Sequence, residues 1–310
     1  MTLVFGLALL GVAALLLGLG ADLFVDNARG LAMGLGTTGL AVGLLLAGAE
    51  PEELVTAIIA SARGHPEIAA GDAIGANITM LTLVLGALLL LQPLEATMRV
   101  RIYASAALAS ALLAALTLTG GTVTRLEGAI LVLAYVGFVS TVIVREHRQA
   151  LATSNGARLQ ATTPTRWRAA LLALAGLVVV TLGGWSAVSG AVRVVASLSL
   201  SESGVGLTLV AFATSAELLA LLWAARRHEV TELAVAALVG SVVGNATATL
   251  GSAAVVRPLE SGGTVTAAWV AVGLSMLLVA PLDANRRRAR TIGVVLVGSY
   301  ALFVVLALSA

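Results

Sequence analysis

Ten apolar segments follow one another along this chain, and each is close to the roughly 20 residues that a helix needs to cross a bilayer. They lie at 2–28, 36–62, 69–92, 101–120, 126–144, 167–197, 204–225, 232–256, 264–281 and 291–309. Only 11% of the residues are charged, against about 25% in a soluble domain. The sequence therefore predicts an all-α polytopic membrane protein with ten transmembrane helices. The first segment lacks a basic start, so we expect a membrane helix there and not a cleaved signal.

The longest polar stretch, residues 145–166, divides the segments into five and five. We expect a first five-helix repeat at 1–144, a linker loop at 145–166 and a second five-helix repeat at 167–310. Most arginines lie in the odd-numbered connections. The even-numbered connections hold only Arg63, Arg125, Arg193 and Arg257. The positive-inside rule then predicts a cytoplasmic 145–166 loop with both termini outside, in the plasma membrane of a prokaryote.

An odd number of spans in each half means that the two halves enter the membrane in opposite senses, as in inverted-repeat transporters. A shift of 165 residues without gaps superposes several polar and glycine positions. It places Glu52 on Glu217, Glu67 on Glu232, Gly75 on Gly240, Thr82 on Thr247 and Gly86 on Gly251. Such matches are less expected by chance than matches of Ala or Leu in this composition. The sequence therefore predicts two inverted five-helix repeats.

Three glutamates, Glu50, Glu52 and Glu53, surround Pro51 inside the second apolar segment, in the stretch GAEPEELVTA. Proline removes a backbone donor and clashes with the preceding turn, so helix 2 should break there. Carboxylates and unwound carbonyls are the hard oxygen ligands that cations such as sodium and calcium prefer. We therefore expect an intramembrane cation site. An alternative stays open, because Pro-Glu-Glu-Leu also suits an ordinary helix start. Glutamates of a helix that began at Pro51 would be interfacial.

The seventh segment carries a counterpart, AFATSAELLA, so we expect helix 7 to be broken as well. Thr214 and Ser215 add two hydroxyls, and Glu217 adds a carboxylate. An acid inside a span costs about 2.5–3.5 kcal/mol on insertion scales and is a functional candidate by default. The alternative is a buried acid that stays protonated.

The third and eighth segments contain GDAIGANITMLTLVLG and GSVVGNATATLG, with glycines four residues apart that are typical of close helix packing. Asn77 and Asn245 add polar groups that packing does not need, so we expect them to be ligands. Asp72 lies near the end of its segment, where it would serve an access path or the membrane interface. Asp22 and Asp26, one turn apart near the end of the first segment, are further candidates for the ion path. The predicted cation ligands are Glu53, Glu217, Glu50, Glu52, Thr214, Ser215, Asn77 and Asn245.

Other classes of site find little support. Cysteine is absent, which excludes a thiolate metal site and a cysteine nucleophile. The three histidines lie in loops beside arginines, and neither H-E-x-x-H nor G-x-S-x-G occurs. The scattered arginines form no nucleic-acid patch. We expect no enzyme and no cofactor, with the lipid bilayer and transported cations as partners and the oligomeric state left open.

Three stretches resemble the sodium/calcium exchanger membrane domain of the calcium/cation antiporter superfamily. These are GADLFVDNARGLA at 20–32, ELVTAIIASARGHPEIAAGDAIGANI at 53–78 and GLTLVAFATSAELLALLWAARR at 206–227. The resemblance covers both signature repeats and the five-plus-five topology. It implies a ten-helix inverted-repeat exchanger whose midplane ion sites take one glutamate from each signature, Glu53 and Glu217.

The chain departs from that pattern in both copies. GAEPEEL stands where the family has G-T-S-L-P-E-L, so Ala49 and Glu50 replace the Thr and the Ser. The second copy is one residue short and lacks the proline. The gap-free shift pairs Glu217 with Glu52, whereas the family motif pairs it with Glu53, and both pairings stay open. Fewer hydroxyls weaken the case for sodium, and clustered acids favour proton coupling.

Three functions can be weighed on these residues. The first is an antiporter that exchanges calcium or a similar cation for sodium or protons by alternating access. The second is an intramembrane enzyme with an acidic metal site, which the missing histidine ligands disfavour. The third is a transport-inactive sensor or scaffold on an exchanger fold, which the eroded motifs allow.

Overall fold

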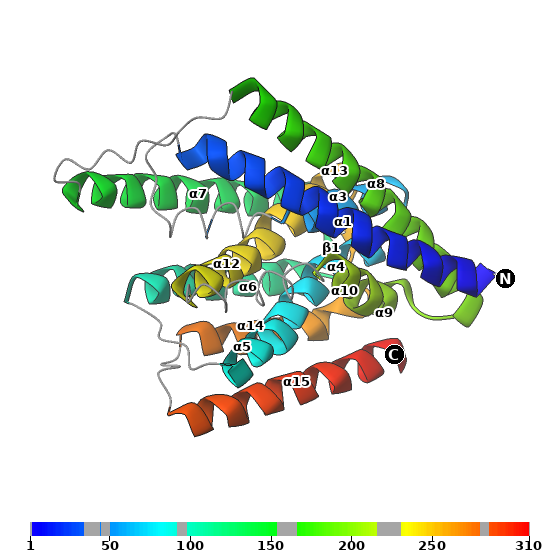
Figure 1. The fold of residues 1–310 in the computed structure, drawn as a ribbon. Helices are drawn as coiled ribbons and strands as arrows, with labels where there is room; N and C mark the ends of the chain where they lie inside the picture. Colours follow the sequence, from blue (N-terminus) through cyan, green and yellow to red (C-terminus); the bar gives the residue numbers. More distant parts are fainter. Residues whose placement is uncertain are drawn as a thin grey trace.

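The structure is a computed structural model that describes residues 2–33, 44, 50–91, 98–153, 166–215, 231–279 and 285–309. The described part is a helical bundle with one two-stranded sheet (Figure 1). Its first half contains α1 (Thr2–Met33), α3 (Pro51–Ala62), α4 (Pro66–Thr79), η2 (Met80–Val84), α5 (Leu85–Leu91), α6 (Met98–Thr119), β1 (Thr122–Val123) and α7 (Arg125–Thr153). Its second half contains α8 (Arg166–Leu198), α9 (Glu202–Val205), η3 (Gly206–Val210), α10 (Ala211–Thr214), α12 (Thr231–Val243), η4 (Gly244–Thr249), α13 (Leu250–Val256), β2 (Leu259–Glu260), α14 (Thr264–Val279) and α15 (Arg286–Ser309).

Every one of these helices lies on a predicted apolar segment. In the described residues, seven helical stretches are long and apolar enough to cross a membrane, and Glu202–Thr214 and Thr264–Val279 are shorter apolar helices. The chain is an integral membrane protein on this evidence. Two predicted segments are described only in part, because 34–49 apart from Leu44, and 216–230, lie outside the described residues. The ten-helix prediction stays a prediction there.

The long helices of the periphery carry their apolar side chains outward. Leu15 and Leu19 of α1, Leu133 of α7 and Leu302 of α15 are all more than half exposed. The stretches Pro66–Leu91 and Val235–Val256 are instead mostly buried inside the protein. This division fits outer helices that contact lipid and inner helices that form the core.

Part of the predicted linker loop is helical. The linker loop was expected to begin at residue 145, but α7 continues through Arg145 to Thr153. The residues REHRQALAT contain good helix formers and neither glycine nor proline, so nothing in them ends a helix at the membrane surface. The described part of the linker is therefore a helical extension.

Helices α1 and α8 pack against each other along much of their length on one side of the bundle (Figure 1). Gly6 lies against Gly190, and Gly20 lies against Gly176, so the two helices run antiparallel. A Cβ atom on Gly20 would come within 2.9 Å of the Gly176 carbonyl oxygen, and one on Gly176 within 2.7 Å of the Gly20 oxygen. Glycine is required at these crossings because the backbones touch.

Two further glycine contacts are related by the 165-residue shift. Gly86 of α5 packs on Gly293 of α15, and Gly251 of α13 packs on Gly128 of α7. The shift carries Gly86 onto Gly251 and Gly128 onto Gly293. The same two helix contacts are therefore made once in each half of the chain.

Local backbone geometry repeats with the same shift. The π-helical stretch η2 at Met80–Val84 corresponds to η4 at Gly244–Thr249. Inside these stretches Thr82 donates to the Ile78 carbonyl at 2.5 Å, and Thr247 donates to the Val243 carbonyl at 2.5 Å. The sequence match of Thr82 with Thr247 is thus also a match of conformation.

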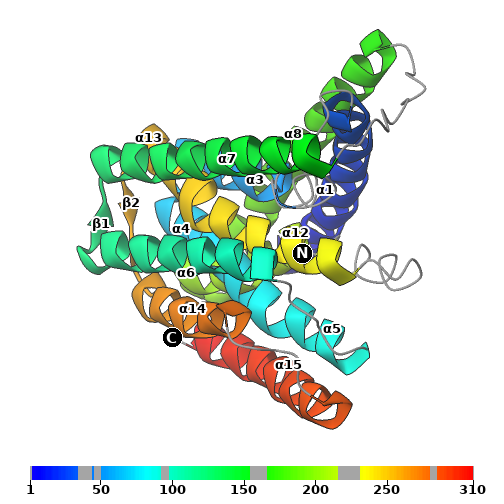
Figure 2. The ribbon, with the colours of Figure 1, turned by 90° about the vertical axis from the view of Figure 1, so that its left-hand side faces the viewer.

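A small antiparallel sheet joins the two halves at one end of the bundle. Thr122 pairs with Glu260 and Val123 with Leu259, and Figure 2 shows β1 and β2 side by side beyond the ends of α6 and α7. The hydroxyl of Ser261 also donates to the Gly121 carbonyl at 2.8 Å. These bonds tie the α6–α7 connection to the α13–α14 connection.

Two glycines of α7 provide a matched test of the close packing. A Cβ on Gly128 would meet the Gly251 oxygen and the Ala254 Cβ at 2.8 Å each, whereas Gly137 has nothing within 4 Å. We predict that Gly128→Ala lowers the free energy of unfolding by about 1–3 kcal/mol, because overpacking moves two helices apart. Gly137→Ala should be neutral or slightly stabilising, because alanine favours the helix. Thermal unfolding of both variants in detergent checks this, and equal behaviour of the two would contradict it.

Candidate cation site between the two halves

Glu50 lies directly before the start of α3. Glu50 has φ 32° and ψ 69°, a left-handed conformation, and α3 then begins at Pro51. Left-handed backbone is unfavourable for a residue with a side chain and is found mostly where the surroundings enforce it. Helix α3 begins at Pro51, where the sequence places the break, but the residues before Glu50 lie outside the described part, so the break in helix 2 stays a prediction.

The helix-start interpretation describes the backbone at Pro51. Pro51 is the first residue of α3, and Glu52 and Glu53 lie in its first turn. All three glutamates are nevertheless buried, with exposed fractions of 3% for Glu50 and 0% for Glu52 and Glu53. The positive end of the α3 dipole favours carboxylates at this position. The helix start therefore holds the acids inside the protein, and their depth in the membrane stays a prediction.

Glu50 is held by two side chains of the second half. Ser241 of α12 donates to Glu50 Oε1 at 2.6 Å, and the Asn245 amide of η4 donates to Oε2 at 3.0 Å. The Asn245 carbonyl oxygen accepts a bond from Thr249 at 3.1 Å, which fixes the orientation of the amide. Asn245 thus lies beside the acids, as expected, with its amide turned toward Glu50.

Glu53 meets the end of α10. This helix ends at Thr214, and the hydroxyl of the next residue, Ser215, donates to Glu53 Oε1 at 3.2 Å. The neighbouring hydroxyl of Thr214 donates to Asp72 Oδ1 of α4, also at 3.2 Å. Two consecutive hydroxyls of the second half therefore contact two carboxylates of the first half.

Asn77 occupies a second contact between the halves. Its amide lies 3.4 Å from the Val242 carbonyl oxygen, its counterpart under the 165-residue shift. Among the described residues, its buried Oδ1 atom has no hydrogen-bond partner. Asn77 is therefore a buried amide oxygen that could coordinate a cation. Glu217 lies outside the described residues, so its pairing with Glu52 or Glu53 stays a prediction.

The site is built from several kinds of oxygen atom. Within the described residues, no three His, Asp or Glu side chains are grouped so that they could hold a metal ion. A cation would therefore need the hydroxyls and amides together with the carboxylates. Mixed, partly neutral ligand sets bind hard cations less tightly than cages rich in carboxylate, which suits an ion that must be released.

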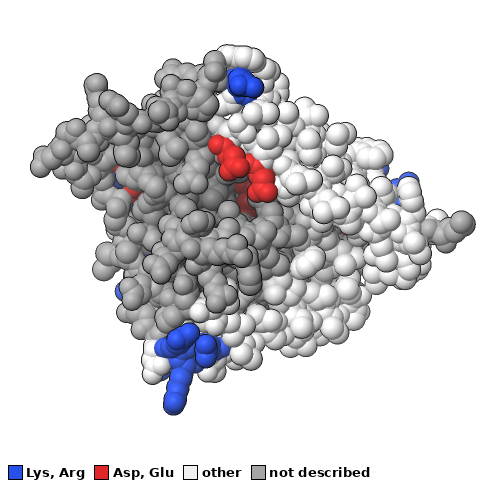
Figure 3. All heavy atoms as spheres, in the orientation of Figure 1, with Lys and Arg blue, Asp and Glu red and all other residues white. Residues whose placement is uncertain are grey.

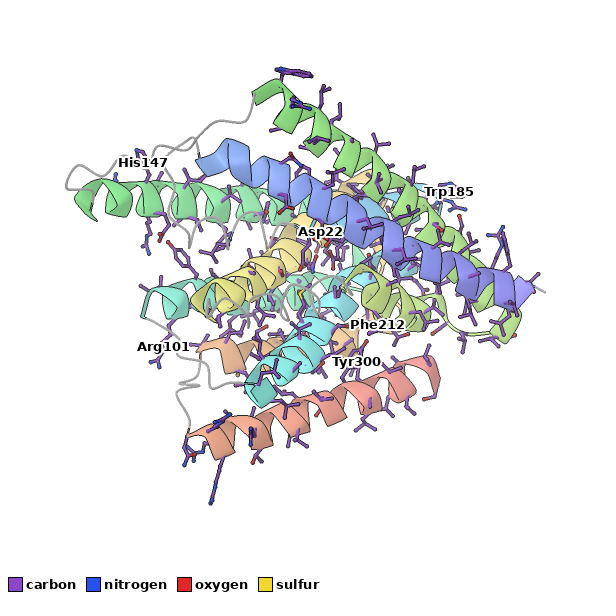
Figure 4. All side chains as sticks on the ribbon, viewed as in Figure 1. Asp22, Arg101, His147, Trp185, Phe212 and Tyr300 are labelled. Atoms are coloured by element: carbon purple, nitrogen blue, oxygen red, sulfur yellow. The ribbon has the colours of Figure 1, made fainter. Side chains whose placement is uncertain are left out.

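The outer face of α1 carries acids in front of this site. Asp22 and Asp26 are exposed, and Figure 3 shows acidic side chains on this face, whereas its basic side chains lie toward the edges. Figure 4 places Asp22 on α1, over the helices that hold the buried acids. A role of the two aspartates in an ion path stays a prediction.

Sequence reasoning missed one residue of this site and the burial of a neighbouring acid. Ser241 is not among the predicted ligands, although it lies one helical turn before Asn245 and so on the same face. Asp72 was placed on an access path or at the interface, but its side chain is fully buried. An acid inside an apolar segment was the signal that could have identified it.

Comparisons with known proteins agree with this geometry. The family model described as "Sodium/calcium exchanger protein" matches residues 5–144 and 168–309. A protein of Alkalimonas amylolytica that is named as an antiporter, CaxA, is 30% identical over 302 residues, covering 93% of this chain and 94% of CaxA. An uncharacterized membrane protein of Methanocaldococcus jannaschii is 27% identical over 259 residues, covering 81% and 82% of the two chains.

Solved structures show the same fold. The sodium-calcium exchanger NCX_Mj soaked with Na+ and Sr2+ superposes with a TM-score of 0.68, at 22% identity and over 97% of each chain. The same exchanger soaked with Na+ and without Ca2+ also gives a TM-score of 0.68, at 21% identity and over 97% of this chain and 98% of that one.

The bond from Ser241 to Glu50 can be tested against a matched serine. We predict that Ser241→Ala lowers the free energy of unfolding by about 1–3 kcal/mol, because a buried carboxylate loses a donor. Ser275→Ala should cost clearly less, since the buried Ser275 hydroxyl donates only to the Ala271 carbonyl of its own helix. Thermal unfolding in detergent without added calcium compares the two. An equal loss in both variants would show that Ser241 does not support Glu50.

Proposed function

Because the chain belongs to the sodium/calcium exchanger family, we propose that it is a secondary-active antiporter that exchanges calcium or a similar cation for sodium or protons. The family and the antiporter relative establish the broad class of cation antiporter and exclude an enzyme. The ions exchanged and the route they take are our proposal.

One observation supports the proposal above all others. Buried carboxylates of the first half are held by hydroxyl and amide groups of the second half, in the contacts of Glu50 with Ser241 and Asn245 and of Glu53 with Ser215. A charge in the interior of a membrane protein is costly and marks an ion path by default. A site shared between two halves can open to either side when one half moves against the other.

The proposed architecture is a pair of inverted five-helix repeats with breaks in helices 2 and 7. The antiparallel contact of α1 with α8 supports this, because these are the first helices of the two halves. The matched pairs Gly86–Gly293 and Gly251–Gly128 support it as well. In such transporters the site lies near the midplane, and alternating access comes from movement of one bundle against the other. We propose that helices 1, 2, 6 and 7 move against the remaining core.

The oxygen atoms of the site favour a hard cation as the transported ion. The clustered carboxylates also allow protons to act as the counter-ion. Glu50 stands where the family signature has a serine, which replaces a neutral hydroxyl by a carboxylate. Several carboxylates in one site need cations or protons to balance their charge. We propose that Glu53 and Glu217 are the shared ligands and that Glu50 or Glu52 compensates for the lost hydroxyls or carries a proton.

The proposed setting is the plasma membrane of a prokaryote, with both termini outside and the 145–166 linker in the cytoplasm. The arginine-rich start of α15 supports this orientation. It lies at the opposite end of the molecule from the two termini (Figures 1 and 3).

Flux through reconstituted protein tests the proposal. We predict that liposomes containing the protein take up radioactive calcium when an opposing sodium gradient or proton gradient is applied. Glu53→Gln and Glu217→Gln should reduce uptake to background, because each removes a charge that faces the ion. Glu127→Gln is the control, since Glu127 is a partly exposed residue that accepts hydrogen bonds from Thr124 at the start of α7.

The two counter-ion arms separate the possible outcomes. Uptake with only one gradient identifies the counter-ion. A correctly folded protein that binds calcium but transports it under neither gradient would exclude exchange and favour the sensor or scaffold alternative.

A further inference from the structure

Asp72 of α4 is a buried acid whose carboxylate has an incomplete set of hydrogen-bond partners among the described residues. Its exposed fraction is 0%. Oδ1 accepts the bond from Thr214, and Oδ2 has no hydrogen-bond partner among the described residues. Among the described residues, no ion pair joins Asp72 to a cationic side chain. A buried carboxylate in this condition is strongly unfavourable unless a cation compensates its charge or a proton neutralises it.

The bond from Thr214 is itself shared. The Thr214 hydroxyl has a single hydrogen, yet it lies 3.2 Å from the Val210 oxygen, 3.0 Å from the Ala211 oxygen and 3.2 Å from Asp72 Oδ1. A buried threonine in a helix is commonly satisfied by the carbonyl one turn earlier. Thr214 therefore does not need Asp72, and Asp72 receives at most a fraction of one donor.

The backbone holds Asp72 in this position. Helices α4 and α10 lie side by side in the centre of the molecule (Figure 1). A Cβ on Gly71 would come within 2.8 Å of both the Ser203 oxygen and the Leu207 nitrogen, so α4 touches the backbone of α9 and η3 at the residue before Asp72. The carboxylate is thereby fixed at the end of α10, where the negative end of the helix also attracts a cation.

Asp72 is linked to the candidate site through the adjacent residues Thr214 and Ser215. Thr214 contacts Asp72 and Ser215 contacts Glu53, so two consecutive hydroxyls connect the two carboxylates. The 165-residue shift places Ala237 opposite Asp72, so the second half offers no equivalent acid at that position. A structural acceptor for Thr214 could have been a neutral amide, so the presence of an acid at this position needs another explanation.

We propose that Asp72 is a ligand of the transported cation, which binds Oδ2 beside the Thr214 hydroxyl. The inference rests on the proposed antiport function and adds to it a fourth carboxylate of the first half. Asp72 then belongs to the site itself and not to the path that leads there.

Equilibrium binding of radioactive calcium and radioactive sodium to the purified full-length chain tests this ligand. Asp72→Asn keeps an acceptor for Thr214 and removes the charge, and Asp72→Ser serves if the first variant does not fold. We expect the affinity for the bound cation to fall by at least about tenfold, a loss that even an outer partner of a metal ligand can produce. The rise in melting temperature caused by that cation should shrink in parallel.

Glu146→Gln is the matched control. Glu146 is also a buried carboxylate, 1% exposed, and it accepts a hydroxyl bond from Tyr103 at 2.9 Å in the α6–α7 pair, away from the site. This variant should bind the cation within about twofold of wild type, a change well under the 1.4 kcal/mol of a tenfold difference.

The outcomes separate this inference from the function on which it rests. Unchanged cation affinity and an unchanged melting shift in folded Asp72→Asn would overturn the ligand role and leave antiport intact. An equal loss in Asp72→Asn and Glu146→Gln would overturn it too, since the effect would not belong to the site. A wild-type protein that binds neither calcium nor sodium would overturn both proposals.

Discussion

A carboxylate inside a membrane protein must find donors or cations, and the described part of this fold is arranged around four of them. Glu50, Glu52, Glu53 and Asp72 are all buried. The donors that reach Glu50, Glu53 and Asp72 come from the other half of the chain, from Asn245, Ser241, Ser215 and Thr214. Because desolvated charge is so unfavourable, neither half is complete by itself. The need to satisfy these acids therefore connects the two halves more specifically than apolar packing can.

Short side chains can make these contacts only because the helices approach closely. Serine, threonine and asparagine reach a few ångströms, so the backbones that carry them must nearly touch. Glycine permits this approach at Gly71, which faces Ser203 and Leu207, and at Gly240, which faces Leu44 directly before Ser241. The glycine pattern and the polar ligands are thus two parts of one arrangement. Without hydrophobic driving force between helices in lipid, close packing and polar contacts must hold them together.

The sequence predicted structural features that depend on a single residue type, such as a helix span or a helix start. It was less informative about contacts that depend on how helices are oriented. Apolar length identified the spans, and Pro51 located the start of α3. The end of α7 could not be inferred, because a polar sequence rich in helix formers continues a helix as readily as it forms a loop. The bond between Ser241 and Glu50 depends on the rotation of α12 about its axis, and the left-handed Glu50 backbone depends on the whole site. Residues 191 positions apart meet there, and no local pattern encodes such a pairing.

The positions of the acids indicate how the repeat has diverged. Under the 165-residue shift Glu50 corresponds to Ser215, so one copy has a carboxylate where the other has a hydroxyl. Ser215 uses its hydrogen to bind Glu53, whereas Glu50 is bound by Ser241 and Asn245. A second carboxylate beside Glu53 would be unfavourable without these two donors. The change from hydroxyl to acid at Glu50 is therefore coupled to the polar groups of α12 and η4. For this reason the two copies can share one backbone plan while the described part of the site divides unequally, with buried carboxylates from the first half and hydrogen-bond donors from the second.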